Sequence, residues 1–157
     1  MLMIPGELIS PAIGQILETM YFCEMEFRGP GVLPEPVIGA AVVFHGTCSG
    51  EMRLAVTDRF ALRITADFLG AEMADITRPQ MVSTVRELAN VACGAALNAW
   101  MPAAGFRFAV PTDLLPPHLS GRFRYLFAEP GEQPKLAMEF SNLNLYGGLS
   151  WRLGDSA

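Results

Sequence analysis

The stretch from Met81 to Trp100 reads MVSTVRELANVACGAALNAW, and it decides how the rest of the chain can be organised. At about 100° per residue, its apolar side chains fall on one broad helical face. That face consists of Met81, Val85, Leu88, Ala89, Ala92, Ala95, Ala96 and Ala99. The many alanines would allow a close approach to a sheet. The sequence therefore predicts a long helix that begins near Thr77-Arg78-Pro79, ends near Trp100 and packs on a sheet.

Two shorter helices are predicted ahead of this one. Ser10-Pro11 is typical of a helix start, because the hydroxyl can cap a free N–H and proline belongs in the first turn. We expect this helix to run to about Phe22 and a loop to follow from Gly29 to Pro36. Thr57-Asp58 can cap a second helix, which Gly70 would end. Its apolar positions are Ala61, Leu62, Ile64, Phe68 and Leu69.

Apolar segments on either side of these helices predict β-strands. Val37–Phe44 and Met52–Val56 have the pattern of a hairpin joined by the turn-rich His45–Gly50. Beyond Pro102 the apolar residues alternate, as they do in half-buried strands. The three alternating groups are Phe106, Phe108 and Val110; Phe123, Tyr125 and Phe127; and Leu136, Met138 and Phe140. The sequence EPGEQP predicts a hairpin connection between the last two groups, and Leu145–Leu153 is expected to add a strand.

Grouped helices and hairpins are typical of an α+β fold. We predict a single domain over residues 1–157, in which an antiparallel β-sheet packs against helices. A chain of 157 residues, of which 51% are hydrophobic and 17% charged, suits one well-filled core.

The composition also argues against several classes of protein. Although the mean hydropathy is +0.30, no apolar stretch approaches the roughly 18 residues that a membrane span needs. The N-terminus has no basic region or cleavage site of a signal peptide, so we expect a cytoplasmic protein with no membrane partner. A net charge of −5 argues against nucleic acid as a partner. The three cysteines contain no CxxC pair, and no His or carboxylate cluster has the spacing of a metal site.

A narrow polar stripe runs along the predicted long helix, nearly opposite its apolar face. Ser83, Glu87, Asn90 and Gly94 are spaced by four, three and four residues, so they would stand one above another. Such a stripe is most often a solvated face. However, Asn is a poor choice for an exposed mid-helix position, and Gly costs about 1 kcal/mol relative to Ala. These costs favour a stripe on which another molecule docks.

The order Ser83-x3-Glu87-x2-Asn90, followed by Gly94 and later by Pro111, resembles the signature of the CheC/CheX/FliY chemotaxis phosphatases. The phrase RELANVACGAALNAW is the closest match. The order of helix, hairpin, helix and motif helix is also similar and covers most of the chain.

The resemblance implies one site rather than two. CheC-type members carry a second copy of the motif on the first helix, whereas here Glu18 is followed three residues later by Tyr21 in place of Asn. The chain is therefore more similar to the single-site CheX-like members than to CheC. The resemblance also suggests a homodimer, for which the aromatic strands offer an edge.

The activity that the resemblance implies is hydrolysis of the aspartyl phosphate on a CheY-like response-regulator receiver domain. Asn90 would position the water, because its amide can both accept and donate hydrogen bonds. Glu87 would pair with a lysine that receivers keep near the phosphate, with a general-base role as the alternative. Gly94 and Asn98 would contact the partner, and Ser83 would contact its edge or bond to its own helix backbone. Mg²⁺ would be held by the receiver, and this chain would bind no cofactor.

Two other functions are compatible with the same residues. The stripe could serve a non-catalytic module that binds a receiver or acts as a scaffold in two-component signalling. A small-molecule sensor ranks last, because the sequence shows no polar pocket signature.

Overall fold

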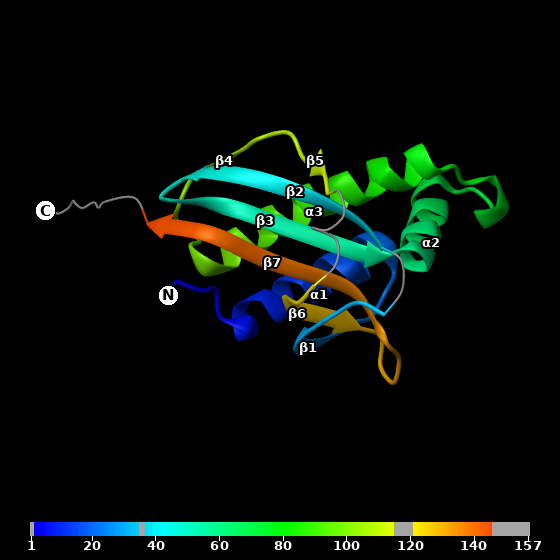
Figure 1. Ribbon diagram of the computed structural model, residues 1–157, viewed down its shortest axis with the longest axis horizontal. Coiled ribbons are helices and arrows are strands. Elements are labelled where there is room, and N and C mark those ends of the chain that lie inside the picture. The colour runs from blue at the N-terminus through cyan, green and yellow to red at the C-terminus, as the bar shows by residue number, and fades with distance from the viewer. Residues whose placement is uncertain (1, 35–36, 115–120, 146–157) are drawn as a thin grey trace, which may run out of the picture.

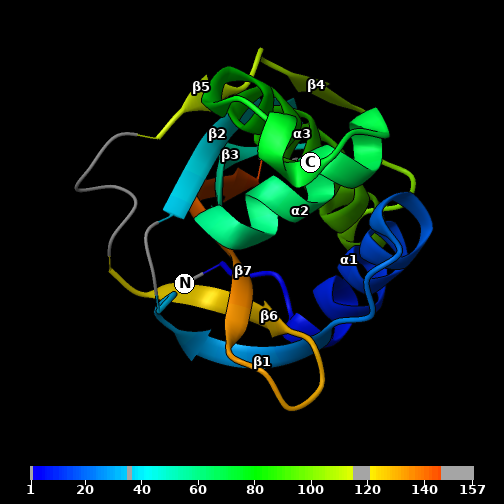
Figure 2. The ribbon, with the colours of Figure 1, turned by 90° about the vertical axis from the view of Figure 1, so that its right-hand side faces the viewer.

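Three helices cover one face of an antiparallel sheet in the computed structural model of the protein (Figure 1). The structure describes residues 2–34, 37–114 and 121–145. The sheet has the strand order β1-β6-β7-β3-β2-β4, and the short β5 also pairs with β2. Every strand pair is antiparallel. Viewed end-on, the sheet curves around α1 and α3, and α2 lies in front of them, at the end of the sheet that is on the right of Figure 1 (Figure 2). The predicted α+β architecture is confirmed.

The strands account for most of the alternating segments. Their bounds are β1 Glu26–Gly31, β2 Val37–Gly46, β3 Cys48–Thr57, β4 Phe106–Phe108, β5 Thr112–Asp113, β6 Phe123–Ala128 and β7 Pro134–Leu145. The predicted hairpin of β2 and β3 is confirmed, but its strands continue through most of the segment expected to be a turn and leave Thr47 between them. The connection of β6 to β7 is also confirmed. A further strand was expected over Leu145–Leu153. Leu145 is the last residue of β7, and the rest of that segment lies outside the described residues.

The two later helices begin and end where their capping residues predict. In α2 (Asp58–Leu69), the Thr57 side chain accepts a hydrogen bond from the Phe60 N–H, and Gly70 takes the left-handed conformation at φ 64°. In α3 (Arg78–Trp100), Thr77 and Gln80 form a reciprocal capping box. A short 3-10 turn, η1 (Met73–Asp75), lies between them. Among the described residues, no helix is both long and apolar enough to cross a membrane.

The first helix begins earlier than predicted. α1 runs over Gly6–Tyr21, with Pro5 as its N-cap, so Ser10-Pro11 lies inside the helix. The Pro5 carbonyl accepts hydrogen bonds from the N–H groups of Leu8 and Ile9, which starts the helix one turn ahead of Ser10. The interior proline removes only one N–H donor near the helix start, and the buried face of α1 continues past it.

The loop was predicted to begin at Gly29, and this start is wrong, because β1 continues through Gly29, Pro30 and Gly31. β1 is an edge strand that pairs with β6 alone, and its register shifts on both sides of Gly29. A proline is tolerated at such an edge, since its missing N–H can face away from the ladder. Gly29 has φ 82°, a conformation that glycine adopts without strain.

The core lies between the helices and the concave face of the sheet. The predicted apolar face of α3 is largely buried there, as are Ile9, Ile13 and Leu17 of α1. Three apolar residues of the predicted elements lie outside this core. Phe68 and Leu69 form the last turn of α2 and are 56% and 47% exposed. Phe108 is 39% exposed because β4 is a short edge strand.

Candidate functional site

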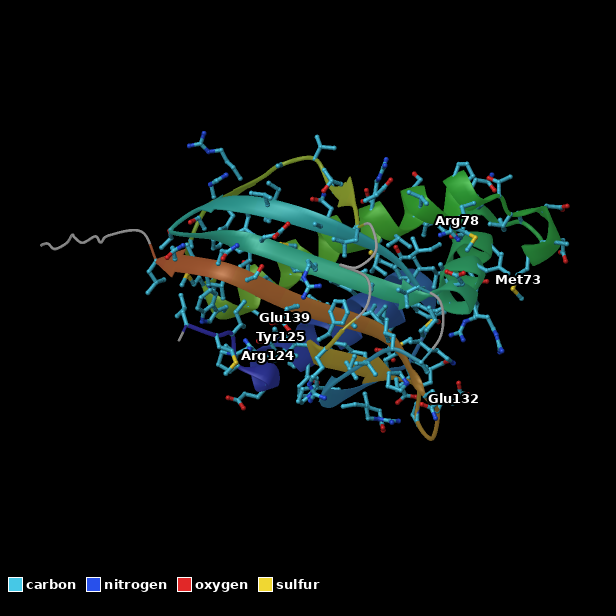
Figure 3. The ribbon with its side chains drawn as sticks, viewed as in Figure 1. Met73, Arg78, Arg124, Tyr125, Glu132 and Glu139 are labelled. Atoms are coloured by element: carbon cyan, nitrogen blue, oxygen red, sulfur yellow. The ribbon has the colours of Figure 1, made fainter. Side chains whose placement is uncertain are left out.

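The polar stripe predicted on α3 faces outward in the structure. Ser83 and Glu87 are exposed, and Asn90 and Gly94 are half-buried. The opposite face of the helix is fixed in the core by Val85 and other fully buried side chains. The capping box fixes the start of the same helix, and Arg78 in its first turn pairs with Asp58 of α2 at 3.8 Å (Figure 3). The stripe therefore stands on a rigid element.

On one side, the stripe borders the end of α2. Ser83 and Glu87 line a hollow of about 320 Å³ together with Phe68 and Leu69 of α2. Gln80 and Thr84 complete its lining. The structure thus brings the first two predicted site residues together, and it adds two apolar neighbours from α2.

On the other side, the stripe borders the segment from β4 to β5. The Arg86 Nε lies 2.8 Å from an Asp113 carboxylate oxygen. Farther along α3, a Cβ placed on Gly94 would lie 3.9 Å from Cζ of Phe108. The segment therefore runs antiparallel to α3 between these two contacts. Pro111 lies within this segment.

Asn98 lies apart from the hollow that holds Glu87. It lines a groove of about 580 Å³ between α1 and α3, with Ala95 and Ala99 of its own helix. Leu8, Pro11, Ala12, Gln15, Ile16, Thr19 and Met20 form the α1 side of this groove. The five predicted site residues thus follow one helix, but Ser83 and Glu87 line one depression and Asn98 lines another.

Tyr21 is the buried neighbour of the stripe on α1. Burial, with the nearby Glu87 carboxylate, raises the pKa of its hydroxyl to about 12. The side chain is 1% exposed, and its hydroxyl finds no hydrogen-bond partner among the described residues. Tyr21 occupies the position where a second motif would carry Asn, so α1 offers a buried phenol there rather than an exposed amide.

The chemistry of the site depends on Glu87 and Asn90. An exposed carboxylate can accept hydrogen bonds from a cation on a partner, and a neighbouring carboxamide can orient a water molecule. Burial raises the pKa of the Cys93 thiol to about 12 and also raises the pKa of Cys23 and Cys48. These thiols are therefore not activated nucleophiles. In the described ranges, no three His, Cys, Asp or Glu residues gather in a way that could hold a metal ion.

Comparison with protein families identifies the family of the chain. The model of the family described as "Chemotaxis phosphatase CheX" matches residues 38–141, which is more than half of the chain and includes β2 through most of β7. The chain belongs to the CheX family. This confirms the resemblance drawn from the motif on α3. None of the curated proteins matches the sequence.

Solved structures of related proteins share the CheX-family fold. CheX of Desulfovibrio desulfuricans is 19% identical, with a TM-score of 0.64 over 88% of this chain and 98% of that one. A chain of the CheX–CheY–BeF3–Mg²⁺ complex of Borrelia burgdorferi is 16% identical, with a TM-score of 0.66 over 88% and 99%. FliY of Thermotoga maritima is 13% identical, with a TM-score of 0.57 over 88% and 91%. At these identities the likeness establishes the fold.

Sequence reasoning missed the two borders of the stripe. Phe68 and Leu69 carry a local signal, because they directly precede the helix-ending Gly70, where a helix often leaves its packing surface. The ion pair between Arg86 and Asp113 joins residues 27 positions apart and had no such signal.

Proposed function

We propose that this CheX-family protein hydrolyses the aspartyl phosphate of a CheY-like receiver domain. The observation that carries the proposal is the outward presentation of Glu87 and Asn90, one helical turn apart, on the rigid α3. Two comparisons support it. The family is described as a chemotaxis phosphatase, and the related Borrelia burgdorferi protein was crystallised with CheY, BeF3 and Mg²⁺.

Asn90 positions the attacking water in this mechanism. An aspartyl phosphate is a reactive acyl phosphate, so its hydrolysis needs a water held in line with the phosphorus more than it needs an added nucleophile. The carboxamide accepts one hydrogen bond from the water and donates another, which fixes its orientation. Asn90 is half-buried and the opposite face of its helix is packed in the core, so the position of its carboxamide is well defined.

Glu87 anchors the receiver next to the phosphate. Its exposed carboxylate pairs with a cationic side chain of the receiver, and such a charge-assisted bond is shorter and stronger than a neutral one. The Mg²⁺ ion belongs to the receiver's acidic pocket in this scheme. Ser83, in the same hollow as Glu87, lies at the margin of the contact.

The lifetime of the phosphate on the receiver tests this assignment. Purified CheY-like receivers from the same genome are phosphorylated in Mg²⁺, and the decay is followed with increasing amounts of the wild-type protein. We expect Asn90→Ala to slow hydrolysis at saturation by about 100-fold, because it removes the group that orients the water. We expect Glu87→Ala to raise the half-saturating concentration by about tenfold as well as to slow the reaction.

Two variants of the same chemical types serve as controls. Asn144→Ala removes an exposed carboxamide from the end of β7, and Glu7→Ala removes an exposed carboxylate from the first turn of α1. With either control variant, the lifetime of the phosphate should be the same as with the wild-type protein. If wild-type protein binds a receiver but leaves its phosphate lifetime unchanged at saturation, the protein is a receiver-binding scaffold and the proposed hydrolysis is wrong. Equal rates for Asn90→Ala and wild type would reject the assigned role of Asn90.

A further inference from the structure

Exposed apolar side chains border the polar stripe of α3 on both of its long sides. Phe68 and Leu69, at the end of α2, are 56% and 47% exposed and line the hollow that holds Ser83 and Glu87. On the opposite side, Phe108 and Val110 are 39% and 83% exposed in the segment that runs along α3 towards Asp113. We call these two pairs the α2 border and the β4 border.

Packing within the chain does not explain the two borders. Single exposed apolar residues are ordinary on protein surfaces, but apolar groups gathered around one polar feature mark an interaction site. Leu69 is the last residue of its helix, and Val110 lies outside both neighbouring strands. Neither side chain belongs to the buried core or to the partly buried residues packed against it.

The dimensions of α3 indicate what can cover both borders. A helix with its side chains is about 10 Å wide, and the borders lie on its two flanks. A ligand that touches both must therefore span roughly that width while reaching Glu87 and Asn90 between them. A small phosphorylated metabolite could approach the stripe without contacting either border. A folded domain can straddle the helix.

We propose that the α2 border and the β4 border dock the receiver domain on whose phosphate Glu87 and Asn90 act. This inference rests on the proposed function and adds the apolar part of the same interface. Contact at both borders buries these apolar side chains and closes the stripe off from bulk water. Water exclusion strengthens the pairing of Glu87 with its cation and leaves the oriented water at Asn90 in place.

If the two borders dock the receiver, the affinity for the receiver and the rate of hydrolysis depend on different residues. Residues of the two borders should set how tightly the receiver binds, whereas Asn90 should set how fast the bound phosphate is lost. Truncating an apolar side chain that binding removes from water costs on the order of 1–2 kcal/mol, which is about tenfold in affinity. The rate at saturating protein should remain that of the wild type, because the borders do not touch the reacting atoms.

Binding to receivers activated with BeF3 and Mg²⁺ tests the inference without requiring hydrolysis. Each CheY-like receiver of the same genome is titrated with wild-type protein, and the receiver that binds is titrated with Leu69→Ala and Val110→Ala. Each variant should raise the dissociation constant about tenfold and leave the saturated rate of phosphate loss unchanged. Phe68→Ala is an independent test of the α2 border should Leu69→Ala fold poorly by circular dichroism.

The chain offers matched controls for both substitutions. Leu145→Ala makes the same change at a 56%-exposed leucine at the end of β7, remote from α2 in Figure 1. Val43→Ala does so at a 40%-exposed valine of β2. Both should bind like wild type. Border variants that bind as tightly as these controls would overturn the inference, as would a wild type that binds none of the activated receivers. Weakened binding by the border variants, together with an unchanged phosphate lifetime, would uphold the docking surface and reject the proposed hydrolysis.

Discussion

At the scale of single residues, Gly94 shows how stability and docking can be separated. It lies in the middle of α3, where glycine is unfavourable, yet a Cβ added there would meet Phe108 only at an ordinary contact distance of 3.9 Å. We expect Gly94→Ala to raise the free energy of unfolding by about 0.5–1 kcal/mol in urea titrations. We also expect it to weaken receiver binding several-fold, because the new methyl group fills space on the stripe.

Gly14→Ala is the control for that substitution. Gly14 lies inside α1, and the nearest atom to its added Cβ is the Met25 carbonyl oxygen at 4.0 Å. This variant should stabilise the protein by a similar amount and leave receiver binding unchanged. If Gly94→Ala is stabilised and also binds normally, the glycine does not serve docking.

The common face of the site residues could be predicted from the sequence, because they all belong to one helix. The spacing of Ser83, Glu87 and Asn90 is enough to place them on one face of α3, because helical geometry is local. Which neighbours surround them depends on the tertiary fold. Leu69 looks like a core residue by periodicity, and only the position of α2 against α3 shows that it borders the stripe.

At the scale of elements, local capping chemistry made α2 and α3 predictable. Thr57, Gly70 and the Thr77–Gln80 box act within a few residues of each helix end. β1 could not be found in this way, since its strand character comes from pairing with β6 about a hundred residues later, as in the pair Glu26 and Ala128. Gly-Pro-Gly reads locally as a turn, and the partner strand overrides that preference.

An ion pair ties α2 to the hairpin of β6 and β7. The Arg63 guanidinium donates to both carboxylate oxygens of Glu129, at 2.9 and 3.0 Å, and to the Cys23 sulfur. Hydrogen bonds from Arg63, joined by those from Lys135, lower the pKa of Glu129 from 4.5 to about 2. Because the folded-state pKa is the lower one, this stabilisation is present above about pH 4.5 and is lost as the pH falls from 4.5 to about 2.

Acid unfolding tests the contribution of this pair. After allowance for solvent screening, we expect Glu129→Gln to lower the free energy of unfolding at pH 7 by about 2 kcal/mol. The difference between variant and wild type should shrink as urea titrations are repeated from pH 5 down to pH 3. Glu132→Gln, at a more exposed partner of Lys135, should change stability by less than about 0.5 kcal/mol. A difference for Glu129→Gln that stays constant with pH would contradict the role given to the ionised pair.

At the scale of the whole molecule, α3 lies between supports drawn from distant parts of the chain. α1 and α2 pack against it, and β5 contacts it beside the stripe. The N-terminal segment joins this arrangement through Ile4, which is fully buried and whose carbonyl accepts a hydrogen bond from the Tyr125 hydroxyl of β6 (Figure 3). That single bond links residues 121 positions apart and holds the chain ahead of α1 against the sheet.

Two buried tyrosines provide a matched test of this link. Tyr125→Phe keeps the ring and its edge contact with Phe140, but it leaves the buried Ile4 carbonyl without that donor, so we expect a loss of about 1–2 kcal/mol in the free energy of unfolding. Tyr21→Phe removes a hydroxyl for which the described part of the chain provides no partner, so it should be neutral or slightly stabilising. Urea titrations of both variants measure the contrast. Equal losses would mean that the Ile4 bond does not hold the N-terminal segment, because the two substitutions would then share only the removal of a phenolic oxygen.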